Sequence, residues 1–490
     1  MSQSRKDIEQ SSSSLSAPDS DQTTRRSFLE QSAQVSLAVG AMSLVGAKSA
    51  FARDGQSLSP SAEPGDRHFF FHIQISSGVD VQYTFDARPL DMTAKKLIAN
   101  YHGQEPILYT GSNGQSTFRS SLTDPLMKWS DRFSIINGVV MSPNFDGHDQ
   151  GTNILFTGSP FGGDSYLPWA NTRSAALDYV ESGFVFASVT NNSGAMNLDP
   201  KSCKALALRV GELGRQNRTL TALGRRADRA GLGKSSLAQS SRLMSKAMGN
   251  VPAFALSFSA VQLSEPTPFD PNSPREKLLS ETKSNVEMFT ELMRTGITDN
   301  ALMSINLNID AHDIKTAQSL TTQVPAIAEA LALVFEQLSV TPSPSGRSML
   351  DDTTILIGTE FARTMRQSYR EFETTGTDHN PLTNTLILAG RGIRGGQVFG
   401  QTDFQTAEED LSKAHLALDK DKSRLMGRPF DPATGRVLGD LKPEAFDPTL
   451  YLGAGHVTNT LQQVLGIPQE RRFTFGRNLP VIPMIPGLLA

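Results

Sequence analysis

Ionisable side chains stand beside several apolar runs of this sequence, where a run ends or begins. They are Asp80, His148, Asp310, His312, Glu360 and His379. Because parallel strands bring their carboxyl ends to one edge of a sheet, side chains far apart in the chain can converge there. Carboxylates and imidazoles together are the ligands of a divalent cation such as Zn²⁺, Mn²⁺ or Ca²⁺.

The predicted metal ligands are Asp80, Asp310, His312, Glu360 and His379. Glu360 can also serve as a general base. Arg363, three residues further on, can hold an anionic group through bidentate hydrogen bonds.

Structural interpretations of the same residues stay open. His312 and His379 can be hydrogen-bonded polar residues at a strand edge. Glu360 and Arg363 can form an internal ion pair that holds a loop. His148 can cap a helix. The glycines at 390–396 lack the spacing of a dinucleotide-binding loop and make turns instead.

The elements that would position these residues alternate along the chain. Apolar runs at 68–75, 133–141, 183–189, 302–309, 353–358 and 384–390 predict buried strands. Apolar residues recur at helical spacing from Ile314 to Leu338, which predicts a long amphipathic helix packed on the sheet. A shorter helix is expected at 459–467. This order predicts an α/β fold, a three-layer sandwich in which helices cover both faces of a mostly parallel sheet.

Length and charge limit the class of protein. The 490 residues can form one large α/β domain with insertions or two domains. We expect one domain at 67–490, with a basic helical insertion at about 205–250 and a charged surface excursion at about 405–450. The net charge of −4 gives no global electrostatic case for nucleic acid. The single cysteine, Cys203, cannot form an internal disulfide.

The N-terminal region has the pattern of an export signal. A polar leader precedes the twin arginine Arg25-Arg26, a moderately apolar stretch and the small-x-small ending Ala50-Phe51-Ala52. This pattern is typical of a Tat signal over residues 1–52, with a linker at 53–66. It predicts the Tat translocase as partner during export and a periplasmic or secreted protein. No later stretch has the roughly 18 consecutive apolar residues of a transmembrane anchor.

Three motifs carry a resemblance to a known family: Glu360-Phe361-Ala362-Arg363, Asp310-Ala311-His312 and the segment GGQVFGQTD at 395–403. With them the chain resembles a family of uncharacterised, Tat-exported, sulfatase-like bacterial proteins, the domain of unknown function 1501. That family lies within the alkaline phosphatase and sulfatase superfamily. The resemblance implies an alkaline-phosphatase-like fold and a metal-dependent hydrolase of phosphate or sulfate esters.

The resemblance also implies roles for single residues. Asp80 matches the metal-binding aspartate after the first strand, and His379 matches a histidine in the loop before a later strand. Asp310 and His312 match an aspartate and histidine of one metal site. The superfamily's Asp-His pair falls on Glu360-Phe361, where phenylalanine cannot bind a metal.

The position of the nucleophile is less regular. Counting back from Thr157-Gly158 places His148 where the superfamily carries its nucleophile, so His148 or water is the expected attacking group. Because the standard nucleophile is missing, a catalytically silent relative that binds a cell-envelope component or partner protein is the alternative. His456 falls at a helix start and is expected there as a structural residue.

Overall fold

The structure is a computed structural model that describes part of the chain. The described residues are 67–91, 98, 100–141, 147–157, 186–187, 196–197, 264, 268–294, 300–305, 307, 309–365, 376–404, 425–432, 436–439, 450–466 and 482–490. They all belong to one compact unit, Ser57–Gly214 with Asn250–Ala490. The predicted signal segment 1–52, the linker 53–66 and the insertion at about 205–250 lie outside the described residues.

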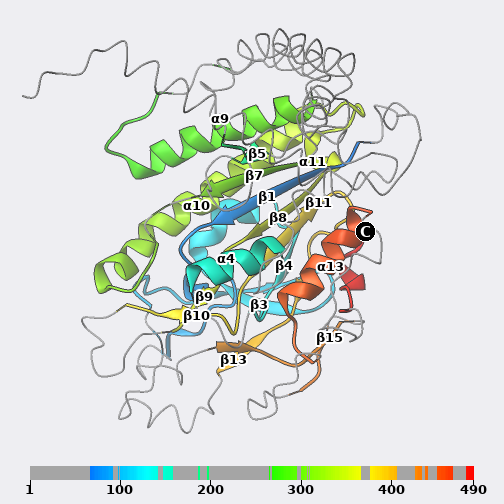
Figure 1. The fold of residues 1–490 in the computed structure, drawn as a ribbon. Coiled ribbons are helices and arrows are strands. Elements are labelled where there is room, and N and C mark those ends of the chain that lie inside the picture. Colours follow the sequence, from blue (N-terminus) through cyan, green and yellow to red (C-terminus); the bar gives the residue numbers. More distant parts are fainter. Residues whose placement is uncertain are drawn as a thin grey trace, which may run out of the picture. The chain divides into compact units, whose positions relative to one another are not determined.

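An eight-stranded sheet forms the centre of this unit, in the order β12-β4-β11-β8-β1-β7-β5-β6 (Figure 1). Its strands are β1 Phe69–Ile75, β4 Phe133–Ile136, β5 Phe186–Ala187, β6 Met196–Asn197, β7 Asn300–Ile305, β8 Thr353–Gly358, β11 Leu386–Gly390 and β12 Val398–Phe399. Neighbouring strands pair in parallel, except that β11 is antiparallel to both β4 and β8. The predicted mostly parallel sheet is confirmed.

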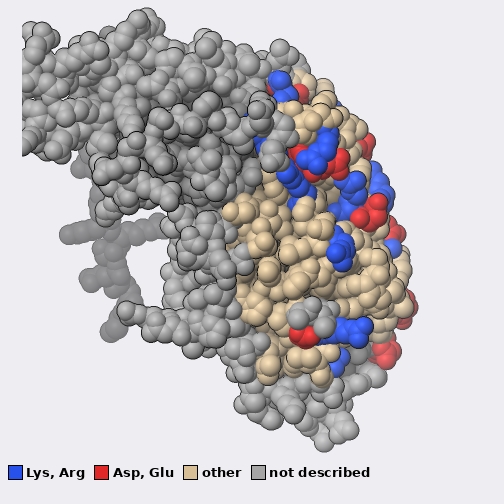
Figure 2. Space-filling view, turned by 90° about the vertical axis from the view of Figure 1, so that its right-hand side faces the viewer, with Lys and Arg blue, Asp and Glu red and all other residues tan. Residues whose placement is uncertain are grey.

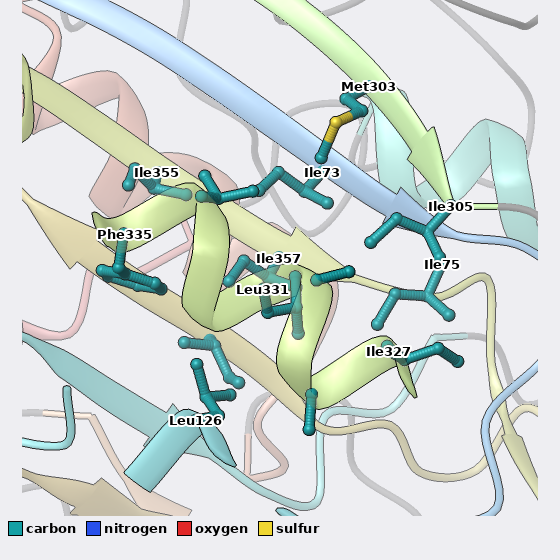
Figure 3. Packing of buried hydrophobic residues seen from close by; sticks show 14 of the residues in the cluster. Ile73, Ile75, Leu126, Met303, Ile305, Ile327, Leu331, Phe335, Ile355 and Ile357 are labelled. Atoms are coloured by element: carbon teal, nitrogen blue, oxygen red, sulfur yellow. The ribbon is translucent and has the colours of Figure 1, made fainter. Parts of the chain in front are cut away.

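One face of the sheet is covered by two long helices. The predicted amphipathic helix is confirmed as α10, Ile314–Val340, and it begins where the Asp313 side chain accepts hydrogen bonds from the amides of Lys315 and Thr316. Its apolar side lies on the strands, where Ile327, Leu331 and Phe335 pack among isoleucines of β1, β7 and β8 (Figure 3). The helix α9, Pro274–Arg294, was not predicted; its Phe289 ring packs edge-on against Phe71 of β1 at 5.4 Å.

Among the described helices, α10 is long and apolar enough to cross a membrane, and 56% of its most apolar window is buried inside the protein. The apolar residues that give it this composition are those that pack on the sheet. Ala330, Val334 and Phe335, for example, are fully buried. Burial against the sheet accounts for this composition.

The opposite face of the sheet carries α4, His148–Thr157, and α13, Ala454–Val464. Their buried residues, including Ile154, Leu155, Val457 and Leu461, share a cluster with Phe70 of β1. Side chains alternate along β1, because Phe69 and Phe71 face the other cluster. The predicted arrangement of helices on both faces is therefore confirmed.

Short elements complete the fold. The ribbons are β2 Ile107–Thr110 with β3 Ser116–Arg119, β9 Ala362–Arg363 with β10 His379–Asn380, β13 Thr402–Phe404 with β14 Leu425–Gly427, and β15 Phe430–Asp431 with β16 Arg436–Val437. The short helices are η2 Val81–Tyr83, η3 Ser121–Thr123, α3 Asp124–Met127, α11 Met349–Asp352 and η7 Pro486–Leu488. Within the predicted surface excursion at 405–450, the described residues Leu425, Met426 and Phe430 are buried.

Charge is mixed on the described surface seen in Figure 2. Basic and acidic side chains are interspersed there, with uncharged surface between them. Among the described residues, Lys128 pairs with Glu336 and Arg275 pairs with Glu329. The described part of this face therefore has no large area of a single sign.

Candidate metal centre

Four predicted side chains lie together at the carboxyl edge of the sheet. They are His148, the first residue of α4, Asp310 and His312 from the loop between β7 and α10, and His379 from β10. One ligand atom from each lies within 4.8 Å of the others, and all four residues are half-buried. Within the described part of the chain, these four side chains form a group that could hold a metal ion.

The spacing of the ligand atoms fits a divalent cation. The Nε2 atoms of His312 and His379 are 2.9 Å apart, and His312 Nε2 lies 3.3 Å from Asp310 Oδ1. His148 Nε2 lies 3.7 Å from Asp310 Oδ2. Four ligands about 2.1 Å from a tetrahedral zinc ion would be roughly 3.4 Å apart. The three separations, from 2.9 to 3.7 Å, lie on either side of this distance.

Glu360 holds the outer nitrogen of His148. Its Oε1 lies 2.8 Å from His148 Nδ1 and also accepts the Ser77 amide at 2.7 Å, while its Oε2 accepts the Thr359 hydroxyl at 3.1 Å. The hydrogen bond to Glu360 raises the pKa of His148 above its ordinary value, against the opposing effect of burial. With Nδ1 held in this way, Nε2 faces the other ligands, as in carboxylate–histidine–metal arrangements.

Arg363 holds Asp310. The guanidinium is completely buried, and its Nη2 donates to Asp310 Oδ1 and, at 2.7 Å, to the Ser77 carbonyl. Partial burial favours the neutral acid, but the bond and charge of Arg363, with the nearby imidazoles, lower the pKa of Asp310 below its ordinary value. Arg363 and His379 are also directly opposite in the β9–β10 ribbon. The same ribbon therefore positions one ligand and the cation that orients another.

Phe361 forms an apolar wall of the centre. Its ring centroid lies 4.4 Å from that of His379 and 5.0 Å from that of His148. A Cβ on Gly78 would lie 2.6 Å from the ring, and one on Gly151 would lie 2.9 Å from it. Gly78 has a φ of +73°, a conformation that suits glycine. The ring thus fits between two glycines and packs against two of the imidazoles.

Asp80 lies apart from the four clustered side chains. It is buried, and its carboxylate accepts the Gln82 amide at 2.9 Å, capping η2. Burial raises the pKa of Asp80 to about 7, although Arg363 and the Gln82 amide oppose this. Its place is thus that of a helix cap within the electrostatic reach of Arg363.

Most of the predicted site residues lie at or beside the centre, but several of them have a different role from the one predicted. The predicted residues His148, Asp310, His312 and His379 come together, whereas Asp80 and Glu360, predicted as ligands, are outside the cluster for the reasons above. His379 lies in the two-residue strand β10 instead of a loop.

Two structural interpretations can also be compared with the structure. Arg363 pairs with Asp310, whereas the sequence suggested an ion pair with Glu360. His456 is at the start of α13, where its Nδ1 accepts the Gly453 amide at 3.1 Å, which agrees with its predicted place.

Two residues beside the centre are not among the predicted site residues. Asp378 Oδ1 lies 3.7 Å from His312 Nδ1, on the side away from the clustered atoms. Ser77 contacts both Glu360 and Arg363 through its backbone. The adjacency of Asp378 to His379 was a usable signal for the first residue. The position of Ser77 just past a buried strand was the signal for the second.

The fold and the centre define a mixed α/β protein with a candidate metal site. The profile of a family described as a protein of unknown function, DUF1501, matches residues 292–439. That stretch includes Asp310, His312, Glu360, Arg363 and His379, but neither Asp80 nor His148. No curated protein matches the sequence.

Among solved structures, the chain is similar to the lipoteichoic acid synthase LtaP from Listeria monocytogenes. The two are 10% identical, the match covers 70% of this chain and 71% of that chain, and the TM-score is 0.29.

Proposed function

We propose that this protein is a metal-dependent hydrolase of anionic esters, of the alkaline phosphatase and sulfatase type. The observation that carries the proposal is the convergence of His148, Asp310, His312 and His379 to within 4.8 Å of one another. These residues come from three separate regions of the sequence. A divalent ion held there would act as a Lewis acid toward an ester oxygen.

The donor set favours zinc or manganese over calcium. Three imidazoles and one carboxylate suit borderline cations, whereas Ca²⁺ prefers six to eight oxygen ligands. Glu360 holds His148, and Arg363 holds Asp310, so two of the four ligands are oriented by buried side chains. We therefore assign His148 to the ligand set and propose water as the attacking group.

The bound ion itself would favour an anionic substrate. Its two positive charges and the one on Arg363 equal the negative charges of Asp310, Glu360 and Asp378. A phosphate or sulfate ester would therefore be held by direct contact with the ion, whose four ligands are only half-buried. Export by the Tat pathway, inferred from residues 1–52, would place the reaction in the periplasm or outside the cell.

The direct test is metal analysis of the purified protein, followed by turnover of aryl phosphate and aryl sulfate esters with and without a chelator. We expect about one zinc or manganese ion per chain and turnover that the chelator abolishes. H312A should lose the ion, because His312 Nε2 lies 2.9 Å from His379 Nε2 and 3.3 Å from Asp310 Oδ1 and would share the ion with both. H102A is the matched control, since His102 lies on a loop outside the cluster.

Each outcome decides between the two functions predicted from the sequence. Wild-type protein without stoichiometric metal, or H312A that retains it, would exclude the metal centre. Stoichiometric metal without turnover of either ester class would favour the alternative, a catalytically silent protein that binds an envelope component. Chelator-sensitive turnover of one class would identify the substrate type.

A further inference from the structure

Ser77 has an unfavourable backbone conformation beside the metal centre. It follows β1, the central parallel strand, and its φ is +88°. A residue with a Cβ adopts this region only when its surroundings hold it there, and such residues gather at binding and catalytic sites. Glycine would adopt this conformation without strain. The chain nevertheless carries serine at position 77 and glycine only at the next position.

Both backbone groups of Ser77 are fixed by residues that support the cluster. Its N–H donates to Glu360 Oε1 at 2.7 Å, and that same oxygen lies 2.8 Å from His148 Nδ1. Its carbonyl accepts from Arg363 Nη2 at 2.7 Å, the atom that also donates to Asp310. Ser77 therefore links Glu360 and Arg363, the residues that orient the ligands His148 and Asp310.

The Ser77 hydroxyl makes no hydrogen bond to the residues that the structure describes. The neighbouring Ser76 hydroxyl pairs with that of Ser304 at 3.0 Å. Ser77 bonds only through its backbone to the described residues, and its side chain is half-buried. A serine is thus held in a conformation suited to glycine, beside the centre, with a hydroxyl that stabilises nothing in the described structure.

We propose that Ser77 contacts the substrate, its hydroxyl donating a hydrogen bond to an oxygen of the anionic ester. This inference rests on the proposed function of the centre and adds a residue to it. The bonds to Glu360 and Arg363 would fix the serine relative to the ligands, so that the ester oxygen meets the hydroxyl and the centre together. A contact with the substrate would explain why position 77 carries a hydroxyl that does not stabilise the described structure.

Two substitutions separate contact with the ligand from a structural role. S77A removes the hydroxyl and keeps the Cβ, whereas S77G removes both and suits the positive φ. On zinc-loaded full-length protein, calorimetric titration with inorganic phosphate should show both variants about 10- to 100-fold weaker than wild type. Zinc affinity should stay within about twofold of wild type, and S77G should melt about 2 °C above S77A. S76A is the control and should bind phosphate as wild type does.

Contrary results are specific. Phosphate binding by S77A equal to that of wild type would overturn the role of Ser77 and leave the proposed hydrolase intact. Loss of zinc in both variants, with S77G melting below S77A, would show that Ser77 is structural. Zinc-loaded wild-type protein that binds neither phosphate nor sulfate would overturn the contact and the proposed function together.

Discussion

Replacement of Glu360 by glutamine tests whether a buried carboxylate sets the metal affinity of the centre. Glu360 is 2% exposed, and its Oε1 serves both His148 Nδ1 at 2.8 Å and the Ser77 amide at 2.7 Å. The amide oxygen of glutamine can take the place of Oε1 and preserve both bonds. The substitution therefore removes the negative charge and changes the shape very little.

The size of the effect follows from these contacts. Outer partners of metal-binding histidines contribute about 10- to 100-fold in metal affinity, or roughly 1.4–2.8 kcal/mol. Because E360Q keeps an acceptor for His148, we expect a loss of about 10-fold. E360A leaves the His148 ring and the Ser77 amide without this acceptor, so we expect a loss of about 100-fold. Its unfolding free energy should also fall by about 1–3 kcal/mol.

The assay is a zinc competition titration against a chromophoric chelator, with urea unfolding of the metal-free proteins beside it. E336Q is the control. It makes the same substitution on α10, where Glu336 is exposed and pairs with Lys128. We expect E336Q to match wild type in zinc affinity. Zinc affinity of both Glu360 variants within twofold of wild type would refute the role assigned to this carboxylate.

Two further substitutions test the surroundings of the centre. Burial raises the pKa of Asp80 from 3.8 to about 7, so the stability from this group is present below about pH 4 and is lost as the pH rises through 7. The side chain of D80N cannot ionise. Its free energy of unfolding in urea, relative to wild type, should therefore rise by up to about 4 kcal/mol between pH 4 and 8. Unfolding free energies that change with pH in the same way for both proteins would contradict this. G151A would place a Cβ 2.7 Å from the Glu360 carbonyl oxygen and 2.9 Å from the Phe361 ring. We expect calorimetry and zinc titration to show lower Tm and lower zinc affinity together, and the reasoning fails if both are unchanged.

The layers of the fold could be predicted because they follow from apolar periodicity. The strand pattern at 68–75 and 353–358 and the helical pattern from Ile314 to Leu338 each gave an element close to the observed one. The direction of β11 could not be predicted in this way, since an apolar run has the same pattern in a parallel or an antiparallel strand. The helix α9 was missed, and its residues outside the core are mostly polar or charged.

The membership of the centre could be predicted only in part. Placement at strand ends brings residues to one edge, but the reach of a side chain depends on its backbone neighbours. Asp80 is turned toward the Gln82 amide, and Glu360 is turned toward Ser77 and His148. The contacts with Gln82 and Ser77 are made by main-chain amides, which the sequence does not distinguish from one position to the next. His148, expected as the attacking group, faces the other ligands because of the same Glu360 contact.

The segment Glu360-Phe361-Ala362-Arg363 supports the centre without contributing a ligand to the clustered group. Glu360 holds His148, Phe361 packs on His148 and His379, and Arg363 holds Asp310. Ala362 is fully buried and forms a parallel β-bridge with Val79, just past β1. One short stretch after β8 thus orients ligands that come from three other parts of the chain. A phenylalanine in place of a ligand is then a packing element of this centre, and metal binding by the four clustered side chains does not require a ligand at position 361.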